Sequence, residues 1–133
     1  ELAGYHRRGW PSFECNISQM ITPDENVLDL GLMSASCQDY ADVVRTCIAN
    51  RRPPISPDAF AIELASKVFT NGSDCNLVAS KYRETFEAVT RGAKELHFAD
   101  MKWNDDDIRI LAEALQKCSH LEKLCLYGSG VSD

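Results

Sequence analysis

The chain has 133 residues, 44% of them hydrophobic and 26% charged, which is the balance of a soluble globular protein and not of a disordered segment. It carries 20 acidic and 14 basic residues, and the net charge of -6 argues against nucleic acid as a partner because phosphate binding needs a basic surface. No apolar run approaches the roughly 18 to 20 residues that cross a bilayer, so we do not expect the chain to span a membrane.

A first helix is predicted over residues 10–22, where apolar side chains recur at intervals of three and four. Those side chains are Trp10, Phe13, Ile17, Met20 and Ile21. Pro11 suits the first helical turn, where its missing N–H is not needed, and Pro23 cannot continue the helix. The next stretch, ENVLDLGLMS over residues 25–34, is a short apolar run that favours a strand.

Three more helices are predicted before Gly92, so this part of the chain is expected to be mostly helical. The first covers residues 37–50 and ends at the prolines of RRPPISPD. Ser56 is a suitable N-cap for the next, with Pro57 at its first position, and the turn TNGSD precedes the last. The apolar faces of the three helices are Tyr40, Val43, Val44, Cys47 and Ile48, then Phe60, Leu64 and Val68, then Leu77, Val78, Tyr82, Phe86 and Val89.

After Gly92 the sequence repeats itself at an offset of about 28 residues. The offset aligns Ala93, Leu96, Phe98, Trp103 and Asp105 with Leu121, Leu124, Leu126, Val131 and Asp133. Each copy begins as a strand, and an amphipathic helix between the strands carries Ile108, Leu111, Ala112 and Leu115. The acidic triplet at residues 105–107 complements the positive end of the helix dipole. We prefer this role to a metal site because three consecutive side chains at a helix start point in different directions.

The segment LAEALQKCSHLEKLCLYGSGVSD resembles the ribonuclease-inhibitor type of leucine-rich repeat, with the consensus LxxLxLxxNxIxDxGxxxLAxALxxCxxL, as found in large protist and algal repeat proteins. The match covers residues 93–133 and departs from the family at the ladder asparagine, where Met101 and Ser129 stand. The resemblance implies a helix-rich α/β fold that ends in a short, truncated leucine-rich-repeat solenoid, one full repeat and part of a second. Residues 1–92 then form a helical N-terminal region that caps it.

A single repeat cannot bury its own face, so we expect the chain to be the N-terminal cap of a longer solenoid or to dock against another surface. The first helix carries a second resemblance: Trp10 and Glu14 have the spacing of the Trp-Cys-x-x-Glu motif of TIR domains, whose glutamate serves NAD cleavage. Pro11 stands where that family has cysteine, and the strands and loops of the nucleotide pocket have no counterpart in this sequence. Glu14 is therefore assigned no catalytic role.

The repeat resemblance implies a non-catalytic module for protein–protein interaction or scaffolding, with a protein partner that the sequence does not identify. Outward positions on the two strands make Glu95, His97, Lys123 and Tyr127 the candidate partner-binding residues, with His97 and Tyr127 in one contact patch. The alternative is an accessory structural subunit of a large assembly, such as an algal photosynthetic complex. The expected location is the cytoplasm or, alternatively, a chloroplast or another organelle.

Motifs that carry enzymatic chemistry do not occur in the sequence. Its seven glycines form no phosphate-binding loop, and neither GxSxG nor HExxH is present, so we predict no catalytic residues and no cofactor. No CxxC pair occurs and the histidines do not flank the cysteines at zinc-ligand intervals, so no metal site is predicted. The six cysteines are expected to be reduced and buried, or in part disulfide-bonded: Cys15, Cys37, Cys47, Cys75, Cys118 and Cys125.

Overall fold

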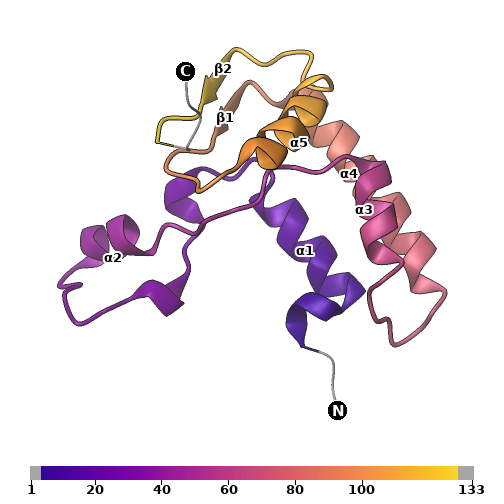
Figure 1. Cartoon of the computed structure of the whole chain (residues 1–133), viewed down its shortest axis with the longest axis horizontal. Helices are drawn as coiled ribbons and strands as arrows, with labels where there is room; N and C mark the ends of the chain where they lie inside the picture. The colour runs from indigo at the N-terminus through magenta and orange to yellow at the C-terminus, as the bar shows by residue number, and fades with distance from the viewer. Residues whose placement is uncertain (1–3, 129–133) are drawn as a thin grey trace.

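The computed structural model describes residues 4–128, and within them the fold is rich in helix, as predicted. The α-helices are α1 Gly9–Gln19, α2 Tyr40–Cys47, α3 Pro57–Leu64, α4 Asp74–Gly92 and α5 Asp105–Leu115. Three short 3-10 helices are η1 Tyr5–Arg7, η2 Asp24–Asn26 and η3 Leu30–Leu32, and the strands β1 Glu95–His97 and β2 Lys123–Cys125 pair in parallel. In Figure 1, α1, α3 and α4 lie together on one side of the small sheet, and α2 stands apart from them.

The main core lies between α1, α3 and α4. It contains Met20, Ile55, Phe60, Leu64, Val78, Tyr82, Phe86 and, from α5, Ala114. The Phe60 ring stacks on the Tyr82 ring with 3.9 Å between their centroids, and the Tyr82 hydroxyl donates to the carbonyl of Ile55 at 2.9 Å. That hydrogen bond satisfies the one polar atom that the Tyr82 side chain brings into the core.

The start of α3 agrees with the prediction, because the Ser56 hydroxyl accepts a hydrogen bond from the Ala59 N–H and Pro57 occupies the first turn. The buried face of α4 agrees only in part. Val78, Tyr82 and Phe86 are buried, whereas Leu77 is 49% exposed. Neighbouring residues lie about 100° apart around a helix, so Leu77 turns outward once Val78 takes the inward position.

The prediction that Val68 continues the apolar face of α3 is wrong, since that helix ends at Leu64. Val68 instead forms a parallel bridge with Arg8. The Val68 N–H donates to the Arg7 carbonyl at 2.8 Å, and the Val68 carbonyl accepts from the Gly9 N–H at 3.0 Å. Phe69 then packs against Gly9 at the start of α1, where an added Cβ would lie 1.9 Å from the Phe69 ring. Glycine at position 9 permits this close approach.

The strand predicted over residues 25–34 is also wrong. η2 and η3 occupy half of this range, and within it Leu28 alone forms a bridge, an antiparallel one to Ile48. A strand needs a partner along its length, but the residue opposite Leu28 is Ile48, the C-cap of α2, and the chain before Ile48 is helical and cannot extend the ladder. The apolar run therefore pairs at one residue only.

Residues 30–46 form an excursion from the body of the protein, which we call the arm. It contains η3 and α2, and α2 is shorter than the helix predicted over 37–50. Its base is closed by hydrogen bonds from Asp29 N–H to the Cys47 carbonyl at 2.7 Å and from Ala49 N–H to the Val27 carbonyl at 2.9 Å. The arm projects beside the rest of the molecule in Figure 1.

A second core lies under the small sheet and is formed by Ala93, Leu96, Phe98, Met101, Trp103 and Leu111. Trp103 is thus a core residue, as its repeat position predicts. The register pairs Glu95 with Lys123 and Leu96 with Leu124, which is the offset found in the sequence repeat. The aligned positions Val131 and Asp133 lie outside the described residues, as does Ser129.

The turn that follows each strand also repeats. Asp100 has a φ of 55° and Gly128 a φ of 70°, and the two residues hold the same place in the two copies. An added Cβ at Gly128 would lie 2.1 Å from the Asp100 carboxylate, so the second turn requires glycine for its φ and for the close approach. The two segments therefore share backbone geometry as well as apolar spacing.

The helix between the strands, α5, begins with a capping box that the sequence analysis missed. The Asn104 side chain accepts hydrogen bonds from the Asp106 and Asp107 N–H groups, and the Asp107 carboxylate accepts one from the Asn104 N–H. Asp106 forms an ion pair with Arg109. The acidic triplet therefore acts at the helix start, which agrees with the role expected from its sequence position.

Candidate partner-binding face

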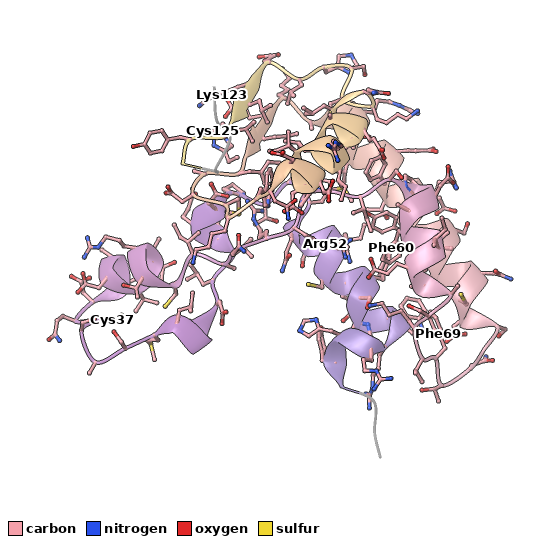
Figure 2. All side chains as sticks on the ribbon, viewed as in Figure 1. Cys37, Arg52, Phe60, Phe69, Lys123 and Cys125 are labelled. Atoms are coloured by element: carbon pink, nitrogen blue, oxygen red, sulfur yellow. The ribbon has the colours of Figure 1, made fainter. Side chains whose placement is uncertain are left out.

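The outward side chains of β1 and β2 form the candidate face, and we use "the sheet face" for Glu95, His97, Lys123, Cys125 and Tyr127. The first four form two cross-strand pairs, Glu95 with Lys123 and His97 with Cys125. Figure 2 labels Lys123 and Cys125 on β2. The alternating inward residue of β1, Leu96, is 3% exposed, whereas its partner on β2, Leu124, is 37% exposed.

Charge pairing orders part of the sheet face. The Glu95 carboxylate lies 3.0 Å from Nε2 of His97 and 3.7 Å from Nζ of Lys123. The hydrogen bond with His97, and then the nearby charge of Lys123, hold the pKa of the Glu95 carboxyl below its usual range. The face thus presents a carboxylate between two nitrogen groups, an arrangement that can pair with polar groups of a partner.

The predicted patch of His97 and Tyr127 stays a prediction, since Tyr127 comes two residues after Cys125, the partner of His97 in the register. The register sets His97 opposite Cys125, and the His97 ring bonds to Glu95 on its own strand. Tyr127 follows β2 in the turn before Gly128 and is 81% exposed. The candidate residues therefore lie on one small sheet, but the contact of His97 is with a carboxylate.

A buried ion pair closes the outer edge of β1. Arg51 and Asp24 form this pair, and the side chain of Arg51 is fully buried. Arg51 donates to the His97 carbonyl at 2.7 Å, and Asp24 accepts from the Ala99 N–H at 2.9 Å. The His97 carbonyl at the end of β1 and the Ala99 N–H just after it point away from β2, so the pair takes the place of a further strand.

Other bonds of Arg51 tie the sheet to the helical part. Its guanidinium donates to the carbonyls of Gln19, the last residue of α1, and Thr22, at 2.7 and 2.6 Å, and lies 5.1 Å from the Phe98 ring centroid. The Arg51 backbone N–H reaches the Met101 sulfur at 3.3 Å. Met101, which stands where the repeat family has its asparagine, is thus part of this buried junction.

Sequence reasoning missed both members of the ion pair. Asp24 follows the proline that ends α1, and Arg51 lies in the proline-rich stretch that was interpreted only as a helix break. The available signal was a pair of arginines, Arg51 and Arg52, before two prolines, in a segment that could not be a regular helix. That signal indicates neither which arginine is buried nor which residue is its partner, because Arg51 is fully buried and Arg52 is half exposed.

The cysteine and histidine near the end of α5, Cys118 and His120, bind backbone carbonyls. His120 Nδ1 lies 2.9 Å from the Arg91 carbonyl and the Cys118 thiol donates to Ala114, so the two side chains do not form a nucleophile–base pair. Burial raises the pKa of the Cys118 thiol, which favours the unreactive protonated form. Trp10 donates to the Asp74 carboxylate at 3.1 Å, and Glu14 lies exposed on α1.

All six cysteines are free thiols, and Cys47 is the one that is buried, so the expectation of buried cysteines holds for that residue alone. Across residues 4–128, no group of three or more His, Cys, Asp and Glu side chains is arranged to hold a metal ion. No helix in the described range combines the length and apolarity that crossing a bilayer demands.

Comparisons with known proteins assign no family. No protein-family model matches the chain, and no curated protein or solved structure is significantly similar to it. The function is therefore argued from the geometry of the chain itself.

Proposed function

We propose that the chain is a non-catalytic protein-interaction module in which the helical part caps one end of a leucine-rich-repeat sheet. The observation that carries this proposal is the asymmetry of the sheet edges. The Arg51–Asp24 pair occupies the edge of β1, whereas β2 has no other strand beside it within residues 4–128. A sheet closed on one side and open on the other can grow in one direction only.

The direction of the β2 backbone supports this reading. The Lys123 N–H donates to Lys94, and the carbonyls of Cys125 and Tyr127 accept from Phe98 and Asp100. Because alternate residues of a strand point to opposite sides, Leu124 and Leu126 direct their backbone groups to the open edge. Leu124, which is 37% exposed, offers apolar surface to a strand that pairs there.

The test of the cap is a fusion of the chain to three consensus repeats of the ribonuclease-inhibitor type, joined in the register of the sequence repeat. If the chain caps them, circular dichroism during urea unfolding will show one cooperative transition with a midpoint above that of the repeats alone. Two independent transitions, with the repeats no more stable than without the chain, would exclude the cap.

A pair of proline substitutions tests the edge. Leu124→Pro removes an N–H at the open edge, so we expect the chain alone to keep its stability and the fusion to lose its single transition. Cys125→Pro is the matched control, because its N–H faces β1 and its loss should destabilise the chain alone. Equal effects of both substitutions in the chain alone would contradict the assigned strand direction.

The accessory-subunit alternative predicts different behaviour of the isolated chain. An interaction module should be a monomer with a cooperative transition whose midpoint does not change with concentration. An accessory subunit needs its neighbours, so it should aggregate or unfold without cooperativity. Sedimentation and circular dichroism over a concentration series separate the two.

A further inference from the structure

The arm has no core of its own. None of residues 30–46 is buried, although an isolated helix as short as α2 is not stable in water. Its large apolar side chains are exposed by 50% to 73%: Leu30, Leu32, Met33 and Tyr40. Tyrosine and methionine are typical anchors of protein interfaces, and a group of exposed apolar residues on one short excursion marks an interaction surface.

The arm and its base are acidic. Residues 25–46 contain four carboxylates, Glu25, Asp29, Asp39 and Asp42, against a single arginine, Arg45. Asp29 accepts from the Gly31 N–H, Asp39 from the Asp42 N–H, and Asp42 from the Gln38 N–H. These hydrogen bonds hold three of the carboxylates in fixed positions, and Arg45 pairs with one of the three, Asp42. A negative charge therefore accompanies the apolar surface.

A groove joins the two features. It has a volume of about 500 Å³ and is lined by Glu25, Asn26, Tyr40, Ala41, Val44 and Arg45. α2 lines it with Tyr40, Ala41 and Val44, and η2 lines it with Glu25, which forms no ion pair among the described residues. Such a groove suits a large apolar side chain with a cation beside it.

We propose that the arm docks a basic amphipathic helix from another protein. Charge complementarity selects this occupant, since an apolar surface with excess carboxylates attracts a segment that places Lys or Arg beside its apolar face. A second copy of this chain would bring the same carboxylates, and its net charge of -6 opposes self-association through the arm. An anionic membrane surface is disfavoured for the same reason. This surface is separate from the sheet face and does not depend on the proposed cap.

Three synthetic helical peptides of 14 residues test the proposal: one of Leu and Lys with an apolar face, one with Glu in place of Lys, and one with Ser in place of Leu. Calorimetry should detect binding of the Leu/Lys peptide alone, weakening as salt is raised. Methyl NMR should place the shifts at Leu30, Leu32 and Met33. Binding of the Ser/Lys peptide with equal affinity would mean bulk charge attraction, and binding of the Leu/Glu peptide would mean apolar contact without the acidic rim. Either result overturns the proposal.

Paired substitutions locate the site. Tyr40→Ser and Glu25→Lys should each weaken the Leu/Lys peptide by roughly fivefold to tenfold, with an unchanged circular dichroism spectrum. The controls are Ile62→Ser on α3, which is 76% exposed, and Glu84→Lys on α4. Controls that weaken binding as much would show that the arm is not the site. Leu124→Pro should leave the affinity unchanged, which separates this surface from the open edge of β2. Self-association that Tyr40→Ser abolishes would instead assign the arm to a second copy.

Discussion

The arm and the repeat segment (residues 93–128) are both short and apolar, yet they differ in what covers them. Leu96 and Phe98 in the repeat segment are almost fully buried, whereas Leu30 and Leu32 in the arm are half exposed or more. The repeat segment is joined to the helical part by a buried arginine with four acceptors, while the arm is joined at its base by backbone hydrogen bonds. Apolar sequence thus becomes core only where another layer faces it.

The largest expected effect comes from breaking the junction of the repeat segment. Arg51→Ala leaves Asp24 buried without its partner and removes the donor to the His97 carbonyl, so it should cost about 3–5 kcal/mol in the free energy of unfolding. Arg52→Ala is the matched control, because Arg52 is half exposed and its ion pair with Glu63 is worth about 0–1 kcal/mol. Urea unfolding measures both. Similar costs for the two arginines would show that the junction is not the structural link between the two cores.

A leucine pair compares the two regions directly. Leu96→Ala should cost about 3 kcal/mol, because it leaves a cavity in the second core. Leu32→Ala in the arm should change the free energy of unfolding by less than about 0.5 kcal/mol, because that side chain is already half in water. The same unfolding experiment applies. A cost above about 1 kcal/mol for Leu32→Ala would mean that the arm is covered in solution.

Helix caps should act globally in one region and locally in the other. Asn104→Ala removes the capping box of α5 and should cost about 1 kcal/mol, since α5 packs on the cores. Asp39→Ala removes the cap of α2 and should leave the global free energy nearly unchanged, while amide exchange of residues in α2 becomes faster. A global cost as large as that of Asn104→Ala would show that the arm unfolds together with the body.

The smallest expected effect concerns pH. The pKa of Glu95 is lowered in the folded chain by His97 and Lys123, so its stabilising contribution is present above its unfolded pKa of about 4.3 and is lost as pH falls through the lower folded value. Glu95→Gln should therefore lower the stability slightly at pH 7, where the ionised Glu95 contributes, and leave it nearly unchanged at pH 3, so that the difference between the two pH values becomes smaller. Urea midpoints at pH 7 and pH 3 measure this, with Glu84→Gln on α4 as the control. An identical acid response of Glu95→Gln and the unchanged chain would rule out the pairing.

The periodicity of apolar residues was sufficient to predict a helix where one face of that helix packs against the rest of the protein. The spacing of apolar residues predicted α1, α3, α4 and α5, Ser56 and Pro57 marked the start of α3, and the sequence repeat matched the pairing of β1 with β2. The candidate face was predicted from the same repeat, which sets Glu95 beside Lys123. The contact between the His97 ring and the Glu95 carboxylate was not predicted, because several neighbours on a sheet lie within reach of one side chain and the sequence does not say which of them it contacts.

Local sequence alone determined these helices, the cap of α3 and the strand register, because each depends on residues within a few turns or on one repeated spacing. Tertiary structure decided the rest. ENVLDLGLMS has the composition of a strand but lacks a partner along its length, and Asp24 with Arg51 becomes an edge cap only when residues 27 positions apart meet at β1. Burial and pairing each need two surfaces that meet, and the sequence of one segment describes only its own surface.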